Sequence, residues 1–216
     1  MNIVLLGTCT DDKRFFILCL AKILQAYKKV VIYTCRPYSF EDGIGQVYDC
    51  CGIEIHHLFN DGALKEAVSN DEETIKLFDL EDYIPVETEK IVAICDASRM
   101  CLEQSIKLVR QFLEGRQSKE FQVVFLNLME YCKVGEKYMS LFWERSLPDA
   151  SISQIYPVYF EEVNRILMIE NQYFEKLPIR DLTRSYKAVL LKLLSNLLYL
   201  DVKQVKRLMK QAERMK

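Results

Sequence analysis

The chain has 216 residues, of which 50% are hydrophobic and 28% charged, and its formal net charge at pH 7 is -2. This length and composition favour one globular domain with a sizeable core. The pI of about 5.8 gives no overall attraction to polyanions, which argues against nucleic acid as a partner. Seven glycines and five prolines are too few for an all-β protein built on many tight turns.

No targeting or membrane-spanning segment is expected. The apolar start at residues 2–6 is too short for a signal peptide and is soon followed by two aspartates. The longest apolar-rich helix, at 188–200, is interrupted by polar residues. The eight cysteines are scattered without a C-x-x-C pair, which is typical of free thiols in a reducing compartment. We therefore expect a cytoplasmic protein, and association with a membrane surface stays open.

The first predicted elements form a β-α-β unit. An apolar strand at 2–6 leads into a turn with Gly7, a helix at 14–27 that is apolar nearly all round, and a buried strand at 30–34. The next part is less regular. We expect a loop at 35–46, strand-like runs at 46–48 and 53–58, a short helix at 63–69 capped by Asp61, and an acidic stretch at 70–90 with a short strand at 75–78.

From residue 91 onward, strands and helices alternate. The expected strands are 91–95, 121–126 and 152–156, the last one ended by Pro157, and the expected helices are 99–113, 135–145, 160–169, 181–199 with Asp181 as its cap, and 202–215. This order predicts an α/β fold, a mostly parallel sheet flanked by helices on both faces. We expect a single α/β domain over 1–200 and a basic C-terminal helix over 201–216.

Several segments carry a family resemblance. They are the start Met1–Leu6, the helix-to-strand run Leu20–Tyr33, the strand and turn Ile91–Ser98, the strand end Val123–Asn127, and a tail with Ile155–Pro157, Glu162–Met168 and the long last helix. In these patterns the chain resembles the deviant-Walker P-loop ATPases of the MinD/ParA group, including the MinD-like proteins of pilus assembly. The resemblance implies a P-loop NTPase-like three-layer sandwich, ATP with Mg²⁺ as cofactor, protein partners and a face-to-face homodimer.

The first turn departs from the pattern of that family. The family has a glycine-rich loop with one early lysine and a second lysine just before Ser/Thr. In a helix-to-helix match, Gly7 falls at the early lysine and Asp12 at the second. Lys13 then comes one residue late and would serve only in a loop one residue longer. The resemblance therefore implies a degenerate Walker A loop.

The side chains of this loop also oppose phosphate binding. Thr8 and Cys9 replace interior glycines, and their side chains would obstruct the close approach of backbone N–H groups to an anion. Asp11 and Asp12 place negative charge beside the position of a triphosphate, which is repulsive at short range. The aspartate that the family has after its second strand is also missing.

The residues that would hold nucleotide, if the chain binds any, are Gly7, Thr8, Lys13, Asp79 and Asn127. Asp79 is the nearest candidate for holding Mg²⁺. Asn127 closes a strand where the family often reads the base, although a polar residue that caps a strand end is the commoner interpretation. Asp96 has two interpretations, a catalytic carboxylate at the carboxyl edge of the sheet or a helix cap, and the cap is favoured.

Two further groups of residues have candidate binding roles. Cys50-Cys51 and His56-His57 invite a metal interpretation, but neighbours on a strand face opposite sides, so we expect no metal site. The terminal helix carries Lys203, Lys206, Arg207, Lys210 and Arg214. It is a candidate for contact with an anionic membrane or a partner groove, and a solvated helix packed on the domain is the commoner alternative.

Three functions fit the sequence. The leading hypothesis is a degenerate MinD/ParA-like domain that does not hydrolyse ATP and serves as an adaptor or localisation factor in a pilus, secretion or cell-positioning assembly. It needs no cofactor, although ATP-Mg stays possible, and any dimer would be independent of nucleotide. The second is an atypical ATPase that uses Lys13 and Asp79. The third is an unrelated receiver- or flavodoxin-like α/β domain.

Overall fold

The computed structural model describes residues 1–38, 47–58, 73–88 and 90–215. Its centre is an eight-stranded sheet with the order β3-β4-β2-β5-β1-β6-β7-β8. Neighbouring strands are parallel except β3 and β4, which form an antiparallel hairpin at one edge. The strands are β1 Asn2–Leu6, β2 Lys29–Thr34, β3 Val47–Cys50, β4 Ile53–His57, β5 Thr74–Leu80, β6 Lys90–Asp96, β7 Glu120–Leu128 and β8 Ser151–Tyr159.

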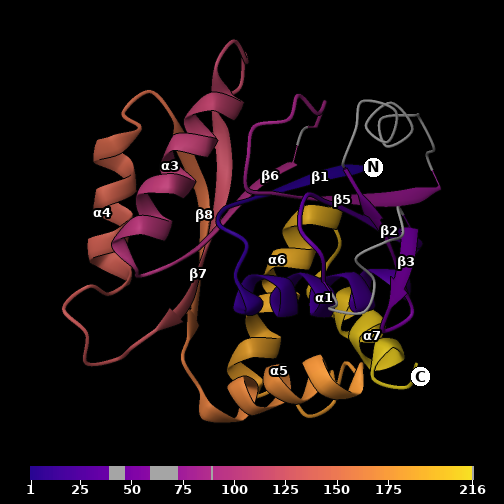
Figure 1. Cartoon of the computed structure of the whole chain (residues 1–216). Helices are drawn as coiled ribbons and strands as arrows, with labels where there is room; N and C mark the ends of the chain where they lie inside the picture. Colours follow the sequence, from indigo (N-terminus) through magenta and orange to yellow (C-terminus); the bar gives the residue numbers. More distant parts are fainter. Residues whose placement is uncertain (39–46, 59–72, 89, 216) are drawn as a thin grey trace.

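Helices cover both faces of this sheet (Figure 1). The described helices are α1 Asp11–Gln25, α3 Arg99–Leu113, α4 Glu136–Ser146, α5 Glu162–Phe174, α6 Arg184–Leu198 and α7 Val202–Ala212. Successive residues of a strand point to opposite faces, so Ile3 and Leu5 pack into the core under α1, α6 and α7, whereas Val4 and Leu6 pack into the core under α3 and α4. The predicted α/β fold with helices on both faces is confirmed.

Several elements differ in extent from the predictions. The strand expected at 75–78 is the fully buried strand β5, which runs over seven residues. Pro157 does not end β8, which continues to Tyr159, because β8 is the outermost strand and a proline at a sheet edge breaks no ladder on its open side. The predicted helix at 63–69 with its cap Asp61 lies outside the described residues.

Two helices begin at other residues than predicted because other residues cap them. Thr10 caps α1, which therefore starts three residues before the predicted start at residue 14. Thr183, and not Asp181, accepts the capping hydrogen bond at the start of α6. The helix expected at 160–169 is α5, which begins at Glu162 and extends to Phe174.

The terminal helix α7 shares the core of the sheet domain. It begins with a capping box of Asp201 and Gln204, and it buries Val205, Met209 and Ala212 in the core that also holds α1 and α6. Its four basic side chains, Lys203, Lys206, Arg207 and Lys210, are exposed, as is Arg214 just after the end of the helix. The domain boundary at residue 200 stays a prediction. Within the described ranges, no helix combines the length and the apolar character needed to cross a membrane.

Candidate functional site

The candidate site lies at the carboxyl edge of the sheet, where parallel α/β folds place ligands. Strands β1 and β5 are neighbours there, with Leu5 in register with Asp79. The chain leaves β1 at Gly7 and enters α1 at Asp11. Because Lys13 lies in the first turn of α1, the sheet topology brings Gly7, Lys13 and Asp79 together.

The ammonium group of Lys13 contacts three oxygen-bearing groups of the protein. Its Nζ lies 2.6 Å from Oδ1 of Asp79, and each of these two side chains is only 1% exposed. The same Nζ donates hydrogen bonds to the carbonyl oxygens of Gly7 at 2.7 Å and Leu80 at 3.4 Å. This lysine therefore reaches back over the loop to the end of β1.

Tyr38 completes this buried cluster. Its hydroxyl donates a hydrogen bond of 2.8 Å to Oδ2 of Asp79, so both carboxylate oxygens of Asp79 have a partner within the protein. Burial, followed by the charge of Asp79, raises the pKa of Tyr38 well above its ordinary value, and the tyrosine stays a neutral donor. We call Lys13, Asp79 and Tyr38 the edge cluster.

Counting from Gly7 gives the loop a different register from the helix-to-helix match. Counted from Gly7, residues 7–14 have the spacing of the phosphate-loop pattern G-x-x-x-x-G-K-[ST], with Lys13 in the lysine position. The contact of Lys13 with the Gly7 carbonyl agrees with this count. The helix-to-helix match had assigned that position to Asp12. The spacing from the glycine was the signal that could have given the register.

The two residues beside Lys13 still depart from the phosphate-loop pattern. Asp12 stands at the second glycine, and its carboxylate pairs with Arg165 of α5 at 2.9 Å. Arg14 stands at the Ser/Thr position, whose hydroxyl would bind Mg²⁺. The guanidinium of Arg14 donates to Sγ of Cys9 at 3.2 Å and pairs with Asp11 at 3.3 Å. Charged side chains thus occupy the positions that would accommodate phosphate and its metal ion.

The backbone of the loop is not shaped as an anion cradle. Such a cradle alternates right- and left-handed residues so that successive N–H groups converge. Gly7 has a φ of +143°, and none of residues 8–10 has a positive φ. Thr10 Oγ1 accepts a hydrogen bond from the backbone N–H of Lys13 at 3.2 Å, and Asp11 and Asp12 place carboxylates in the first turn of α1, where the helix dipole favours negative charge.

The other two predicted nucleotide residues lie outside the edge cluster. Thr8 donates a hydrogen bond to Gln104 of α3 at 3.0 Å and lines an open cavity of about 440 Å³. Asn127 is not the last residue of β7, which ends at Leu128. It has a φ of +53° at an irregularity in the pairing with β8, and it lines a cavity of only about 20 Å³ beside the Asp12–Arg165 ion pair.

The remaining candidates have structural roles in the described chain. Asp96 is the last residue of β6 and accepts a hydrogen bond of 2.8 Å from the backbone N–H of Ser98. The favoured interpretation of Asp96 as a helix cap is wrong, because Ser98 is the N-cap of α3 and no side chain makes the capping hydrogen bond there. Among the residues that the structure describes, no three His, Cys, Asp or Glu side chains are grouped closely enough to hold a metal ion.

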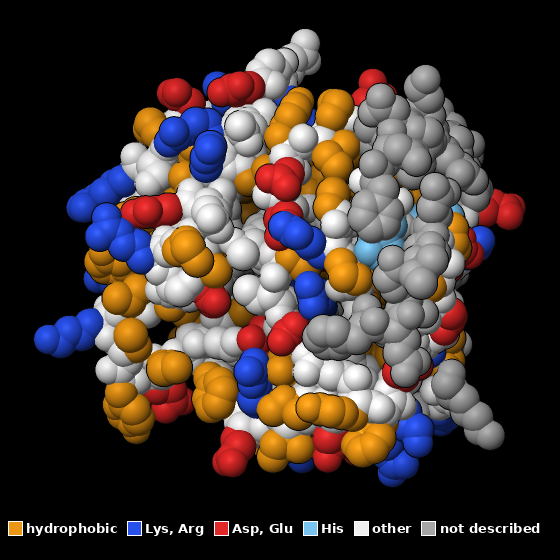
Figure 2. All heavy atoms as spheres, viewed as in Figure 1, with side chains coloured by type: hydrophobic (Ala, Val, Ile, Leu, Met, Phe, Trp, Pro, Cys, Tyr) orange, Lys and Arg blue, Asp and Glu red, His pale blue; other side chains and the backbone are white. Residues whose placement is uncertain are grey.

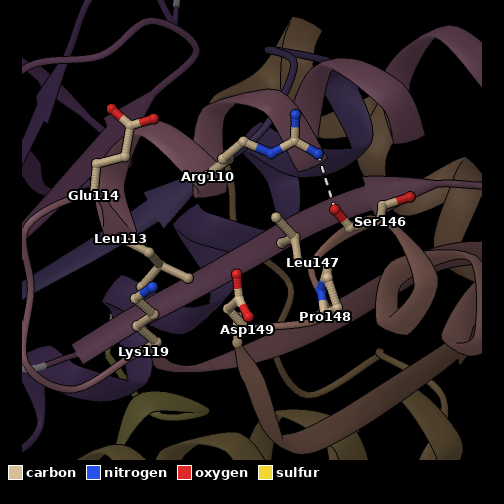
Figure 3. A pocket seen from close by; sticks show the side chains of 9 residues that line it. Arg110, Leu113, Glu114, Lys119, Ser146, Leu147, Pro148 and Asp149 are labelled. Atoms are coloured by element: carbon tan, nitrogen blue, oxygen red, sulfur yellow. Dashed lines mark hydrogen bonds between the residues drawn. The ribbon is translucent and has the colours of Figure 1, made fainter.

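A separate cavity lies at the opposite edge of the sheet (Figure 3). It measures about 220 Å³ and lies between the ends of α3 and α4 and the start of β7. Arg110 of α3 donates a hydrogen bond of 2.8 Å to the carbonyl oxygen of Ser146 across it. Glu114, Lys119 and Asp149 also line it, so the cavity has mixed charge and is remote from the edge cluster.

Comparison with known proteins finds similar solved structures but no similar sequence. No protein-family model matches the chain, and no curated protein sequence matches it. Many solved structures match most of its length, among them the following three. A ParA family ATPase from Chlorobium tepidum has a TM-score of 0.57 at 10% identity, with 88% of this chain and 96% of that chain covered.

The second match is a complex of a Cyanothece McdA variant with ATP, which has a TM-score of 0.56 and 14% identity over 93% of this chain and 97% of that one. The third is the MinC:MinD cell division protein complex of Aquifex aeolicus, with a TM-score of 0.53 and 10% identity over 100% of this chain and 98% of that one. At these identities the likeness shows the fold alone, and that fold is the one found in the MinD/ParA ATPases.

Proposed function

We propose that this chain, which has the fold of the MinD/ParA ATPases, does not hydrolyse ATP and serves as an adaptor or localisation factor in a pilus, secretion or cell-positioning assembly. The observation that carries this proposal is the edge cluster. Lys13 and Asp79, the two residues best placed for phosphate and Mg²⁺, are paired with each other and are nearly excluded from solvent.

The energetics of the cluster support this proposal. A nucleotide would have to draw Lys13 away from Asp79 and replace both partners of the pair at once, because a buried charge left without a partner costs about 3–5 kcal/mol. A triphosphate would also approach the carboxylates of Asp11 and Asp12, and no glycine follows Gly7 in the loop to form a cradle. The mutual attraction of Lys13 and Asp79 therefore competes directly with nucleotide.

A role through protein partners is supported by the surface of α5. Val163, Ile166, Ile169 and Tyr173 follow one another three or four residues apart and are 42–78% exposed. At this spacing they lie on one side of the helix. Figure 2 shows hydrophobic side chains gathered at the lower edge of the molecule, over α5. Exposed apolar patches of this kind mark protein–protein contacts, and one matched structure is itself a complex, MinC:MinD.

A cytoplasmic location is part of the proposal, and contact with a membrane is open to α7. Its basic residues are exposed, whereas its apolar side is buried against the core that holds α1 and α6. Contact with an anionic membrane would therefore be electrostatic and would not insert an apolar helix face. The same basic residues suit an acidic protein partner equally well.

The proposal predicts an oligomeric state that ATP does not change. In light scattering, the molar mass of the chain is expected to be the same with and without ATP-Mg²⁺, because the chain binds no nucleotide that could bridge two copies. The matched control is the double variant Lys13→Met with Asp79→Leu, which removes both charges of the buried pair and should give the same molar mass as the parent under both conditions. A dimer that forms only in the presence of ATP would contradict the proposal.

An atypical ATPase is the second candidate function. One specific observation favours it, since Lys13 falls at the lysine position of the phosphate-loop spacing and lies 2.6 Å from the carboxylate that would hold Mg²⁺. This function requires steady ATP turnover that the Lys13→Ala substitution abolishes. A parent chain without turnover would end this candidate.

A further inference from the structure

The turn between β3 and β4 holds two neighbouring cysteines in a fixed arrangement. Cys50 ends β3 and is paired with Ile53 of β4, so that Cys51 and Gly52 form a two-residue hairpin loop. Their φ angles are +58° and +76°, as in a type I′ turn. Asp49 Oδ1 accepts a hydrogen bond of 2.9 Å from the backbone N–H of Gly52 and fixes the loop.

Two polar side chains from different helices converge on Cys51. Asn171 of α5 donates a hydrogen bond from Nδ2 to Sγ of Cys51 at 3.2 Å. Lys22 of α1 donates from Nζ to the carbonyl oxygen of Cys51 at 3.0 Å. Asn171 is 7% exposed and Lys22 is 4% exposed. A buried cation and a buried amide are expensive to place, and here both contact one cysteine, although Asn171 Nδ2 also donates to the carbonyl oxygen of Lys176 at 2.9 Å.

The two sulfur atoms have unequal environments. Sγ of Cys50 lies 4.0 Å from Sγ of Cys51 and donates its thiol hydrogen toward it. This hydrogen bond, together with the one from Asn171 and the charge of Lys22, lowers the pKa of Cys51 against the opposing effects of burial and of the charge of Glu175. The same contact and burial raise the pKa of Cys50. By contrast, burial raises the pKa of Cys35 to about 11, and it also raises that of Cys95.

We propose that Cys51 is an oxidative modification site, whose sulfur attacks a peroxide and is then resolved by Cys50 to give a vicinal disulfide. The arrangement has the parts that such a site needs, a nucleophilic sulfur stabilised as its thiolate and a resolving thiol beside it. Cys51 is half-buried, and Cys50 lines a cavity of about 320 Å³ between α1 and α5. The partial exposure of Cys51 is the route by which we expect a small peroxide to reach its sulfur.

The chemistry balances in two steps. The Cys51 thiolate attacks one oxygen of the peroxide, the O–O bond breaks, and the departing alkoxide or hydroxide takes a proton, which leaves Cys51 as a sulfenic acid. The Cys50 sulfur then attacks the Cys51 sulfur, an S–S bond forms, and the sulfenic oxygen leaves as water with the Cys50 proton. Two thiols are oxidised, and one peroxide is reduced to water, or to an alcohol and water.

The product is expected to be easily reduced. Neighbouring Cα atoms are about 3.8 Å apart, which is shorter than the separation of about 4.4 Å or more in ordinary disulfides. The strain of so short a bridge makes the bond a stronger oxidant and more labile. The inference is independent of the proposed function, because neither cysteine belongs to the edge cluster.

The test is treatment of the purified parent chain with hydrogen peroxide, followed by mass spectrometry. We expect the peptide that contains Cys50 and Cys51 to lose two hydrogen atoms, and dithiothreitol to restore them. The Cys50→Ser variant should stop at a sulfenic acid that dimedone traps on Cys51, and the Cys51→Ser variant should leave Cys50 unmodified. Faster oxidation of the exposed Cys132 than of Cys51, or trapping on Cys50 alone, would overturn the proposal.

A second measurement needs no substitution of either cysteine. The rate at which iodoacetamide alkylates Cys51, followed by mass spectrometry, is measured as a function of pH. We expect this rate to rise with a midpoint pH below the ordinary thiol pKa of about 8.5. The Asn171→Leu substitution removes one hydrogen bond to the sulfur and should move that midpoint upward. A midpoint in the parent at or above the ordinary value would also overturn the proposal.

Discussion

Replacing Asp79 by alanine is expected to lower the free energy of unfolding by about 3–5 kcal/mol, because it leaves the ammonium of Lys13 buried without its counter-charge. Lys13 would keep only the carbonyl oxygens of Gly7 and Leu80, and the hydroxyl of Tyr38 would lose its acceptor. Urea denaturation monitored by circular dichroism measures this change.

Two controls separate this effect from a general loss of packing. The Asp96→Ala variant removes a carboxylate at the same edge of the sheet that is not buried and should cost no more than about 1 kcal/mol. The double variant Lys13→Met with Asp79→Leu removes both charges and should regain much of the stability lost in Asp79→Ala. If Asp79→Ala costs no more than Asp96→Ala, the edge cluster is not a buried ion pair.

Replacing Gly7 by alanine is expected to prevent stable folding or to cost more than about 4 kcal/mol. An added Cβ would lie 2.0 Å from the carbonyl oxygen of Ile94 in β6, and the φ of +143° is one that side-chain-bearing residues rarely adopt. Thermal unfolding of the variant, or its failure to accumulate as a folded protein, measures the effect.

Gly115 provides the matched control for that substitution. It also has a positive φ, +74°, but no atom lies within 4 Å of the Cβ that alanine would add. Gly115→Ala should therefore cost only about 1–2 kcal/mol, from the backbone conformation alone. Equal losses in the two variants would mean that the contact with Ile94 is not what requires a glycine. The contact itself gives Gly7 a packing role that does not depend on phosphate.

Sequence patterns were sufficient to predict the α/β architecture. Apolar runs such as Asn2–Leu6 and Ile91–Cys95 mark buried parallel strands, and the intervening helical segments place helices on both faces. The residues at which helices begin were harder to predict from the sequence. The starts of α1 and α6 depend on whether Thr10 and Thr183 or their neighbours make the capping hydrogen bond, and that choice is made by local geometry.

The residues of the candidate site could be predicted only in part from the sequence. Lys13 and Asp79 were recognisable as candidates, but their mutual contact depends on the pairing of β1 with β5. The partner of Asp12 is Arg165 and that of Cys51 is Asn171, more than 100 positions away in each case. The first contact follows from the packing of α5 beside α1 and the second from the position of α5 beside the β3–β4 turn, and no local pattern encodes either of them.

The most direct test of the account is a calorimetric titration of the parent chain with ATP-Mg²⁺. The edge cluster and the carboxylates at the start of α1 predict no binding heat beyond that of dilution, and no release of phosphate in the same sample. Saturable binding in the micromolar range together with turnover would contradict the account, and it would assign Lys13 and Asp79 to a working nucleotide site.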